Sequence, residues 1–138
     1  MRKRTRAREF ALQVLYQIDI THDEPDKALD SFWQAHADES VDEELKDFTS
    51  GLVKGAVENQ SAIDEKICLY AANWKLERMA VVDRNILRLS SFELLFRQDI
   101  PPKVSINEAV DLAKKYSGVE AGKFVNAILD KIKQEKEK

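Results

Sequence analysis

Apolar residues recur at helical spacing along most of the 138-residue chain. The clearest stripe holds six residues at positions i, i+3, i+4, i+7, i+8 and i+11: Ala7, Phe10, Ala11, Val14, Leu15 and Ile18. This spacing places apolar side chains on one face of an α-helix. The same periodicity continues between sparse glycines and prolines. It predicts seven helices, at about 7–18, 25–36, 41–56, 61–70, 76–96, 105–116 and 121–132.

Segment 76–96 differs from the other predicted helices because its apolar residues spread around most of the helix circumference. A helix that is apolar on most sides is usually central, so we place this one in the middle of the C-terminal half. We expect Ser105 and Glu108 to form a capping box at the start of the next helix. Gly118 is expected to break the chain before the last helix.

These patterns together indicate an all-α protein with about seven helices in two packed helical bundles that form one compact domain, residues 1–138. We expect a basic arm at 1–8, an N-terminal helical half at about 9–58 and a C-terminal helical half at about 59–134. A chain of this length buries enough surface to be stable as one domain without disulfides or metals.

Charge is distributed unevenly along the chain, whose net charge is −3. The first eight residues hold five cations and no acid: Arg2, Lys3, Arg4, Arg6 and Arg8. The remainder holds 17 basic and 25 acidic residues, a net charge of −8. A flexible basic arm on an acidic body suits nucleic-acid contact, because guanidinium groups bind phosphate and stack on bases. A solvated terminus that only aids solubility is the open alternative.

The sequence offers little that suits catalysis or metal binding. His22 and His36 have no carboxylate at ligand spacing, and no glycine-rich phosphate loop is present. The single cysteine, Cys68, can form neither an internal disulfide nor a cysteine-based metal site, and its apolar neighbours predict that it is buried. No apolar run suits a membrane span or a signal peptide. We therefore expect a cytoplasmic binding protein that is not an enzyme and needs no cofactor or metal.

Four motifs then stand out in order along the chain. The first is RTRAREFALQVLY at 4–16, and the second is VDRNILR at 82–88, followed by FEL at 92–94. The others are PKVSINEAVDLAK at 102–114 and KFVNAILD at 123–130. Together they resemble the NusB family of bacterial transcription antitermination factors, and the resemblance spans almost the whole chain.

The resemblance implies a function in transcription regulation. It implies that the chain binds the boxA element of nascent ribosomal RNA as a heterodimer with NusE, which is also a ribosomal small-subunit protein. The complex would then join the elongating RNA polymerase with other Nus factors and suppress premature termination. The resemblance leaves open whether the chain alone is a monomer or a homodimer.

Candidate site residues come from three parts of the chain, at 2–16, 83–93 and 120–124. The RNA-binding candidates are Arg2, Lys3, Arg4, Arg6, Arg8, Gln13, Arg84, Glu120, Lys123 and Phe124. The partner-binding candidates are Tyr16, Asp83 and Glu93.

Several of these candidates have a purely structural alternative. Tyr16 can half-bury its ring between helices, and Phe124 lies on a core stripe. Asp83, Arg84 and Arg88 can form an internal ion-pair cluster, which is the better interpretation for Arg88.

Two other functions remain open at this stage. One is a protein–protein scaffold that never touches RNA. The other is a detached recognition domain, because NusB-like domains also occur fused to ribosomal RNA cytosine methyltransferases. This chain has no Rossmann-type region that could bind a methyl-donor cofactor.

Overall fold

The computed structural model describes residues 2–71 and 75–137. Those ranges contain seven α-helices, one short 3₁₀ turn and no strand, so the predicted all-α class with seven helices is confirmed there. The chain divides after Glu58 into two compact units, the first ending at that residue and the second beginning at Asn59. That the whole chain forms a single domain stays a prediction.

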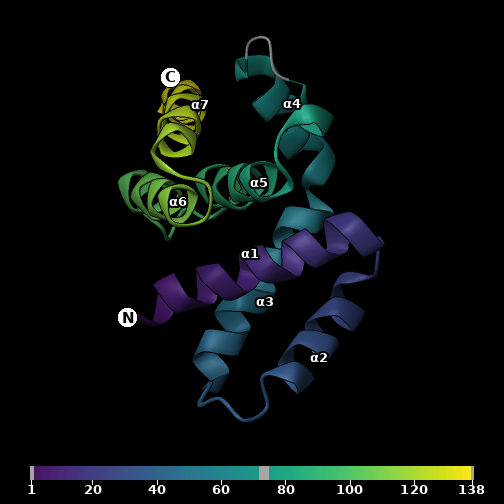
Figure 1. Ribbon diagram of the computed structural model, residues 1–138. Helices are drawn as coiled ribbons and strands as arrows, with labels where there is room; N and C mark the ends of the chain where they lie inside the picture. The colour runs from purple at the N-terminus through teal and green to yellow at the C-terminus, as the bar shows by residue number, and fades with distance from the viewer. Residues whose placement is uncertain (1, 72–74, 138) are drawn as a thin grey trace. The chain divides into compact units, whose positions relative to one another are not determined.

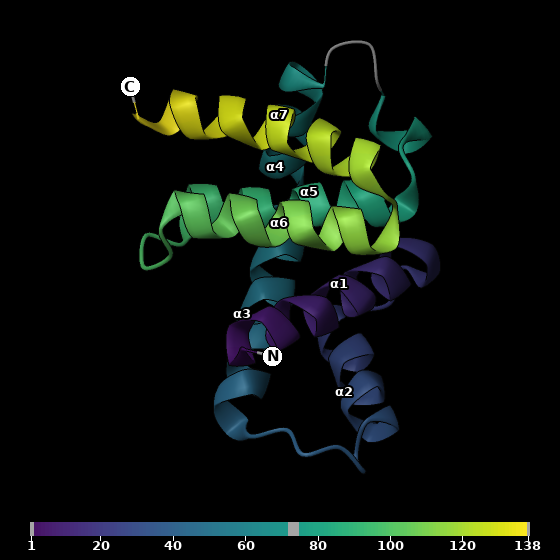
Figure 2. The ribbon, with the colours of Figure 1, turned by 60° about the vertical axis from the view of Figure 1, so that its left-hand side comes forward.

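The first unit contains three helices: α1 (Lys3–Thr21), α2 (Pro25–Ala35) and α3 (Glu43–Glu58). Within this unit α1 lies across α3, and α2 runs beside them (Figures 1 and 2). The interior is aromatic where α1 meets α2, since the rings of Phe10 and Phe32 lie 5.2 Å apart, edge to face. Burial of the α1 stripe against α2 and α3 explains why this amphipathic segment is helical.

Local sequence explains how these three helices begin and end. The α1 helix stops at His22, which takes a left-handed conformation (φ 62°) and donates its N–H to the Ile18 carbonyl at 2.7 Å. Pro25 occupies the first turn of α2, where a missing N–H costs nothing. The Asp42 carboxylate accepts the Leu45 N–H at 2.9 Å and so caps the start of α3.

The second unit contains α4 (Gln60–Tyr70), the 3₁₀ turn η1 (Leu76–Arg78), α5 (Val81–Phe96), α6 (Pro102–Tyr116) and α7 (Val119–Glu137). The α6 and α7 helices pack most extensively on one another, and α5 packs against α4, α6 and α7. Ile86, Leu87 and Leu94 of α5 are fully buried. The predicted central position of this helix in the C-terminal half is therefore confirmed.

The prediction of one continuous helix over 76–96 is wrong at its start. Leu76–Arg78 forms a 3₁₀ turn, Met79 and Ala80 are extended, and the α-helix begins only at Val81. Leu76 and Met79 are nonetheless buried. These two apolar side chains pack a connecting segment onto the core. Their spacing resembles that of a helix, which is why the periodicity predicted a helix where the backbone forms none.

The predicted capping box at Ser105 is also wrong. The helix begins one turn earlier, at Pro102, because proline is already set for the first helical position. Ser105 is therefore inside α6, and its hydroxyl donates to Glu93 Oε1 at 2.8 Å. The predicted break at Gly118 is confirmed, since this residue has φ 106° and separates α6 from α7.

Cys68 is exposed, which corrects the prediction that it is buried. The inner face of α4 is formed by Ile63 and Ile67, one turn apart and both fully buried. Cys68 follows Ile67 by a single residue, about 100° around the helix, and so turns away from that face.

Candidate nucleic-acid interface

The predicted basic arm is helical from Lys3 onward, which corrects the expectation of a flexible terminus. Arg2 is exposed just before α1, and Lys3, Arg4, Arg6 and Arg8 lie in its first two turns. Arginine, lysine and alanine are good helix formers, and contacts with α3 hold this end of α1. Four of the five cations are therefore presented by a helix.

Arg4 and Arg8 share one aromatic partner on α3. Their guanidinium carbons lie 4.5 Å and 5.4 Å from the centre of the Phe48 ring. Arg8 is only 2% exposed, whereas Arg4 is exposed. Arg8 therefore stabilises the packing of α1 on α3, and Arg4 keeps a surface available to a ligand.

Lys3 and Arg6 pair with carboxylates that follow α2. Lys3 Nζ lies 2.9 Å from Asp42 and 3.0 Å from Glu44. One Arg6 nitrogen contacts Glu39 at 2.7 Å, and another donates to the Ser40 carbonyl at 3.0 Å. For these two residues, the prediction of a basic arm with no neighbouring acid is therefore corrected.

The same contacts change the proton affinity of two groups. Hydrogen bonds from the Lys3 ammonium to Asp42 and then Glu44 raise the pKa of Lys3. The pKa of Asp42 is lowered, first by the Leu45 backbone N–H that its carboxylate accepts and then by Lys3. Both shifts favour the charged forms, so Lys3 and Asp42 remain an ion pair at neutral pH.

Gln13 and Tyr16 lie further along α1, on its exposed side. The Tyr16 side chain is 40% exposed, so its ring is accessible rather than enclosed between helices of the first unit. Ile20, one turn further on, is also exposed and extends this surface. Ile20 was not among the predicted site residues, although its spacing places it opposite the buried apolar stripe, on the same side of α1 as Gln13 and Tyr16.

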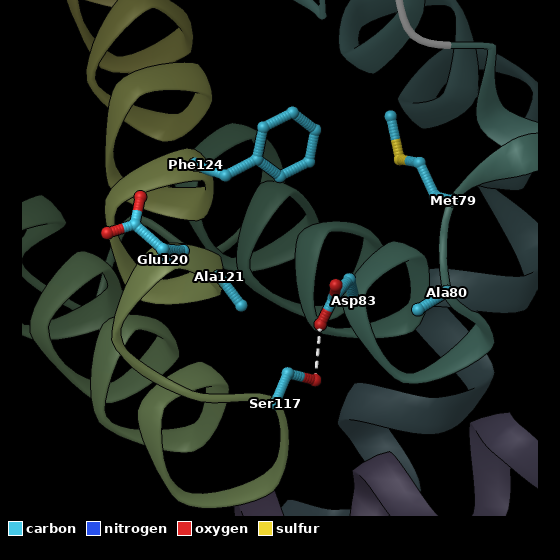
Figure 3. Close-up of a pocket in the computed structure, with 7 residues that line it drawn as sticks. All are labelled: Met79, Ala80, Asp83, Ser117, Glu120, Ala121 and Phe124. Atoms are coloured by element: carbon cyan, nitrogen blue, oxygen red, sulfur yellow. Dashed lines mark hydrogen bonds between the residues drawn. The ribbon is translucent and has the colours of Figure 1, made fainter.

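A groove of about 600 Å³ opens in the second unit, and we call it the α5–α7 groove (Figure 3). It is lined by Met79, Ala80, Asp83, Ser117, Glu120, Ala121 and Phe124. Three predicted site residues, Asp83, Glu120 and Phe124, are thus brought together. Phe124 is partly exposed in the groove and is therefore not a pure core residue, which was the structural alternative for it.

The groove combines an apolar face with carboxylates. Phe124 and Met79 face each other across it, and the Glu120 carboxylate points away from its middle (Figure 3). The Ser117 hydroxyl donates to Asp83 at 2.7 Å, which orients that carboxylate. A flat ring could lie against the Phe124 and Met79 side chains while its amino group donates to Asp83. Met79 and Ser117 were not predicted as site residues. Met79 fits an ordinary apolar pattern, and only the turn between α6 and α7 brings Ser117 to α5.

The other candidates in the second unit have different environments. Lys123 is exposed and lies 3.4 Å from Glu120 on the same helix. Arg84 is half-buried near the start of α5. Glu93 is 1% exposed and accepts the Ser105 hydroxyl, so it does not reach the surface of the described chain.

Arg88 forms an internal ion pair, as the structural alternative predicted, but with a different partner. Its guanidinium donates to both carboxylate oxygens of Asp64 on α4, at 2.8 and 3.1 Å. Arg88 also contacts the Asn85 side chain. This bidentate contact joins α4 to α5, so Arg88 has a structural role in the core.

Among the described residues, no group of three or more histidine, cysteine, aspartate or glutamate side chains is placed to hold a metal ion. No helix in those same ranges has the length and apolar character that crossing a membrane requires.

Comparison with known proteins gives a consistent result. The model of the NusB family matches residues 5–134. The transcription antitermination protein NusB of Anaeromyxobacter dehalogenans is 52% identical over 130 residues, which cover 94% of this chain and 89% of that protein. Its counterpart in Thermodesulfovibrio yellowstonii is 41% identical over 141 residues, covering 96% and 93%.

Solved structures resemble nearly the whole chain. T. maritima NusB superposes with a TM-score of 0.85 at 39% identity, covering 98% of this chain and 92% of that one. A chain from the crystal structure of antitermination factors NusB and NusE in complex with dsRNA gives a TM-score of 0.87 at 32% identity, covering 98% of both chains.

Proposed function

The chain belongs to the NusB family, and from this we propose that it is a transcription antitermination factor that binds RNA together with NusE. Its RNA target is the boxA element of nascent ribosomal transcripts, and the complex joins the elongating RNA polymerase. The protein acts in the cytoplasm by binding and catalyses no reaction.

The observation that carries the RNA-binding proposal is the cationic start of α1 on an acidic unit. Arg2, Lys3, Arg4 and Arg6 lie within five consecutive positions. Residues 9–58 hold 13 acidic and 3 basic side chains, a net charge of −10. A local cationic site in an anionic surrounding favours a phosphate backbone at that one place.

The α5–α7 groove supports a second contact, with an unstacked base. RNA recognition commonly targets single-stranded bases that stack on aromatic rings and donate or accept hydrogen bonds at their edges. Phe124 offers the ring, and the Ser117-oriented Asp83 accepts from an amino group. Glu120 and Lys123 lie beside it, and Arg84 adds positive charge to the second unit.

For the partner, we propose that the acidic first unit attracts a basic NusE and that Tyr16 contributes an aromatic contact. Opposite potentials speed association and fix orientation, while a half-exposed tyrosine supplies apolar area and a hydroxyl. Gln13, one turn away, lies at the boundary between the RNA and the NusE surfaces. Glu93 is left out of this surface because it is buried.

A salt titration of binding to single-stranded boxA RNA tests the phosphate contacts. Each phosphate contact on a single strand contributes about 0.7 to the slope of log affinity against log salt. Replacing Arg2, Arg4 and Arg6 together by glutamine should flatten that slope by about 2. Arg8 is kept because it is buried against Phe48. An unchanged slope would refute the proposed role of α1.

The groove is tested in the same titration with Phe124→Ala. Loss of one base–aromatic stack should weaken binding by about 1–3 kcal/mol while leaving the salt slope unchanged. A matched control is Tyr116→Ala, which removes an exposed ring that does not line the groove. Equal losses in the two variants would argue against a specific base site.

A scaffold that never touches RNA is the rival function, and photocrosslinking separates the two. RNA with a photoreactive uracil analogue should crosslink to the wild-type chain in the presence of NusE. If only NusE were labelled, the scaffold would be the better account.

A further inference from the structure

One acidic segment, residues 38–44, lies against the start of α1. It holds five carboxylates and no cation: Asp38, Glu39, Asp42, Glu43 and Glu44. The segment runs from the turns after α2 into the first turn of α3.

Three carboxylates of the acidic segment occupy the donors that a phosphate would need. Asp42 and Glu44 both contact the Lys3 ammonium, and Glu39 contacts the Arg6 guanidinium at 2.7 Å. The Ser40 carbonyl accepts a hydrogen bond from another nitrogen of Arg6. Carboxylate and phosphate oxygens bind the same N–H groups with similar geometry, so each position holds one or the other.

These contacts are placed where they can exchange. The Asp42, Glu39 and Glu44 side chains are 56%, 44% and 78% exposed. Residues 38–41 lie outside regular helix, so the part of the segment that carries Glu39 can move away while α1 stays packed on α3 through Phe48. Asp42 caps α3 and Glu44 lies within it, so these two release Lys3 by rotation of their side chains. Exposed ion pairs are individually weak, and a phosphate backbone that makes several contacts at once can displace them.

We propose that the acidic segment is an intramolecular competitor of RNA, holding Lys3 and Arg6 until a single-stranded phosphate backbone displaces Glu39, Asp42 and Glu44. This inference rests on the proposed function of α1 in RNA binding. It assigns the segment a part in selectivity. A polyanion that contacts only the start of α1 must overcome the carboxylates, whereas RNA that also makes contacts elsewhere on the protein does so readily.

The test compares two triple variants that remove the same charge. The first is Glu39→Gln with Asp42→Asn and Glu44→Gln, in which asparagine can still cap α3. The matched control is Asp38→Asn with Glu43→Gln and Asp47→Asn, three exposed positions that form no ion pair with Lys3 or Arg6 in the described chain. Circular dichroism establishes that both remain folded.

Affinity for boxA RNA and for an oligouridylate of equal length is measured by fluorescence anisotropy. The first variant should bind about three- to tenfold tighter than wild type, from two or three released surface pairs. The gain should be larger for oligouridylate, and the control variant should change by less than about twofold. Equal gains in both variants would show a general charge effect and overturn the proposal, as would no gain at all.

A coupling experiment locates the effect. Glu39→Gln should tighten RNA binding in the wild-type background and change nothing when Arg6 is already glutamine. If Glu39→Gln had the same effect in both backgrounds, the competition would be refuted while RNA binding by α1 stood. If the Arg2, Arg4 and Arg6 substitutions left RNA binding intact, the proposed function of α1 would fall, and this inference with it.

Discussion

Arg4 and Arg8 differ in exposure although both guanidinium groups lie over the ring of Phe48. One helical turn separates them, and that turn carries Arg8 into the contact between α1 and α3. A buried arginine mainly serves packing, and truncating it costs stability through lost apolar contact as well as lost charge. At the scale of single residues, arginine therefore serves binding where it is exposed, as at position 4, and folding where it is buried, as at position 8.

Ser90 and Ser91 provide a test of the buried polar groups of α5. The Ser90 hydroxyl donates to the Ser105 carbonyl at 3.2 Å, while the equally buried Ser91 hydroxyl has no hydrogen-bond partner among the described residues. Ser91→Ala should leave stability unchanged or raise it by up to about 1 kcal/mol, because it removes a desolvated polar group. Ser90→Ala should lower stability by about 1 kcal/mol.

Urea denaturation of both serine variants measures these differences. A loss of stability in Ser91→Ala as large as that in Ser90→Ala would contradict the assignment of an unsatisfied hydroxyl to Ser91.

At the scale of elements, the Asp42 cap on the Leu45 N–H and the Asp42–Lys3 ion pair to α1 make stability depend on pH. The lowered pKa of Asp42 means that its contribution is complete above the ordinary value of 3.8 and is lost as pH falls through the lowered value. The raised pKa of Lys3 means that its contribution is complete below 10.5 and is lost as pH rises through the raised value. The contact is therefore complete across neutral pH.

We expect Asp42→Ala to be less stable than wild type by a constant amount between about pH 5 and pH 9. The difference should shrink as the pH falls below 3.8, because the wild-type carboxylate is then protonated as well. Thermal unfolding across this range measures it. Asp42→Asn separates the cap from the charge, since asparagine keeps a side-chain oxygen for the Leu45 N–H. A difference that did not change with pH would count against the ion pair.

Gly118 determines how α6 turns into α7. Its φ of 106° is a conformation that L side chains rarely adopt, and an added Cβ would meet nothing within 4 Å. Gly118→Ala should therefore cost about 1 kcal/mol or more from backbone strain alone. Gly118→Asn should cost less, since asparagine tolerates positive φ better. Guanidinium denaturation ranks the two variants, and equal stability of Gly118→Ala and wild type would refute the strain argument.

At the scale of the whole molecule, the net negative charge comes from one stretch of the chain. Residues 9–58 have a net charge of −10, whereas residues 59–138 hold 14 basic and 12 acidic side chains. The net charge of −3 therefore describes no part of the protein well. An acidic unit that starts with a cationic helix suits a protein with two different partners, one basic and one anionic.

From this distribution we expect NusE to raise the affinity of the chain for boxA RNA. Binding of a basic partner to the acidic unit reduces its repulsion of phosphate and adds contacts to the RNA. The isolated chain should bind weakly and the heterodimer more tightly, by about tenfold or more. Titration of labelled boxA RNA with and without NusE measures this. Equal affinities would mean that the two proteins do not cooperate on RNA.

Much of the fold could be predicted from local pattern. The seven helices follow from apolar spacing and from the break at Gly118, both of which involve neighbouring residues. The helix start at Val81 could not be predicted, because Met79 continues the apolar pattern by packing on the core while its backbone is not helical. The start at Pro102 has a local cause that the predicted cap at Ser105 overlooked, since proline suits the first helical position. The exposure of Cys68 likewise depends on which face of α4 is covered by other helices.

The sequence by itself determined the helical class, the family motifs and the cluster of cations before residue 9, since composition and short-range periodicity suffice for each. Only the tertiary structure decided which cations are available. Arg6 meets Glu39 across 33 residues, and Asp83 meets Ser117 across 34. Ion pairs and grooves of this kind depend on how helices pack, and that packing brings together residues that no local pattern relates.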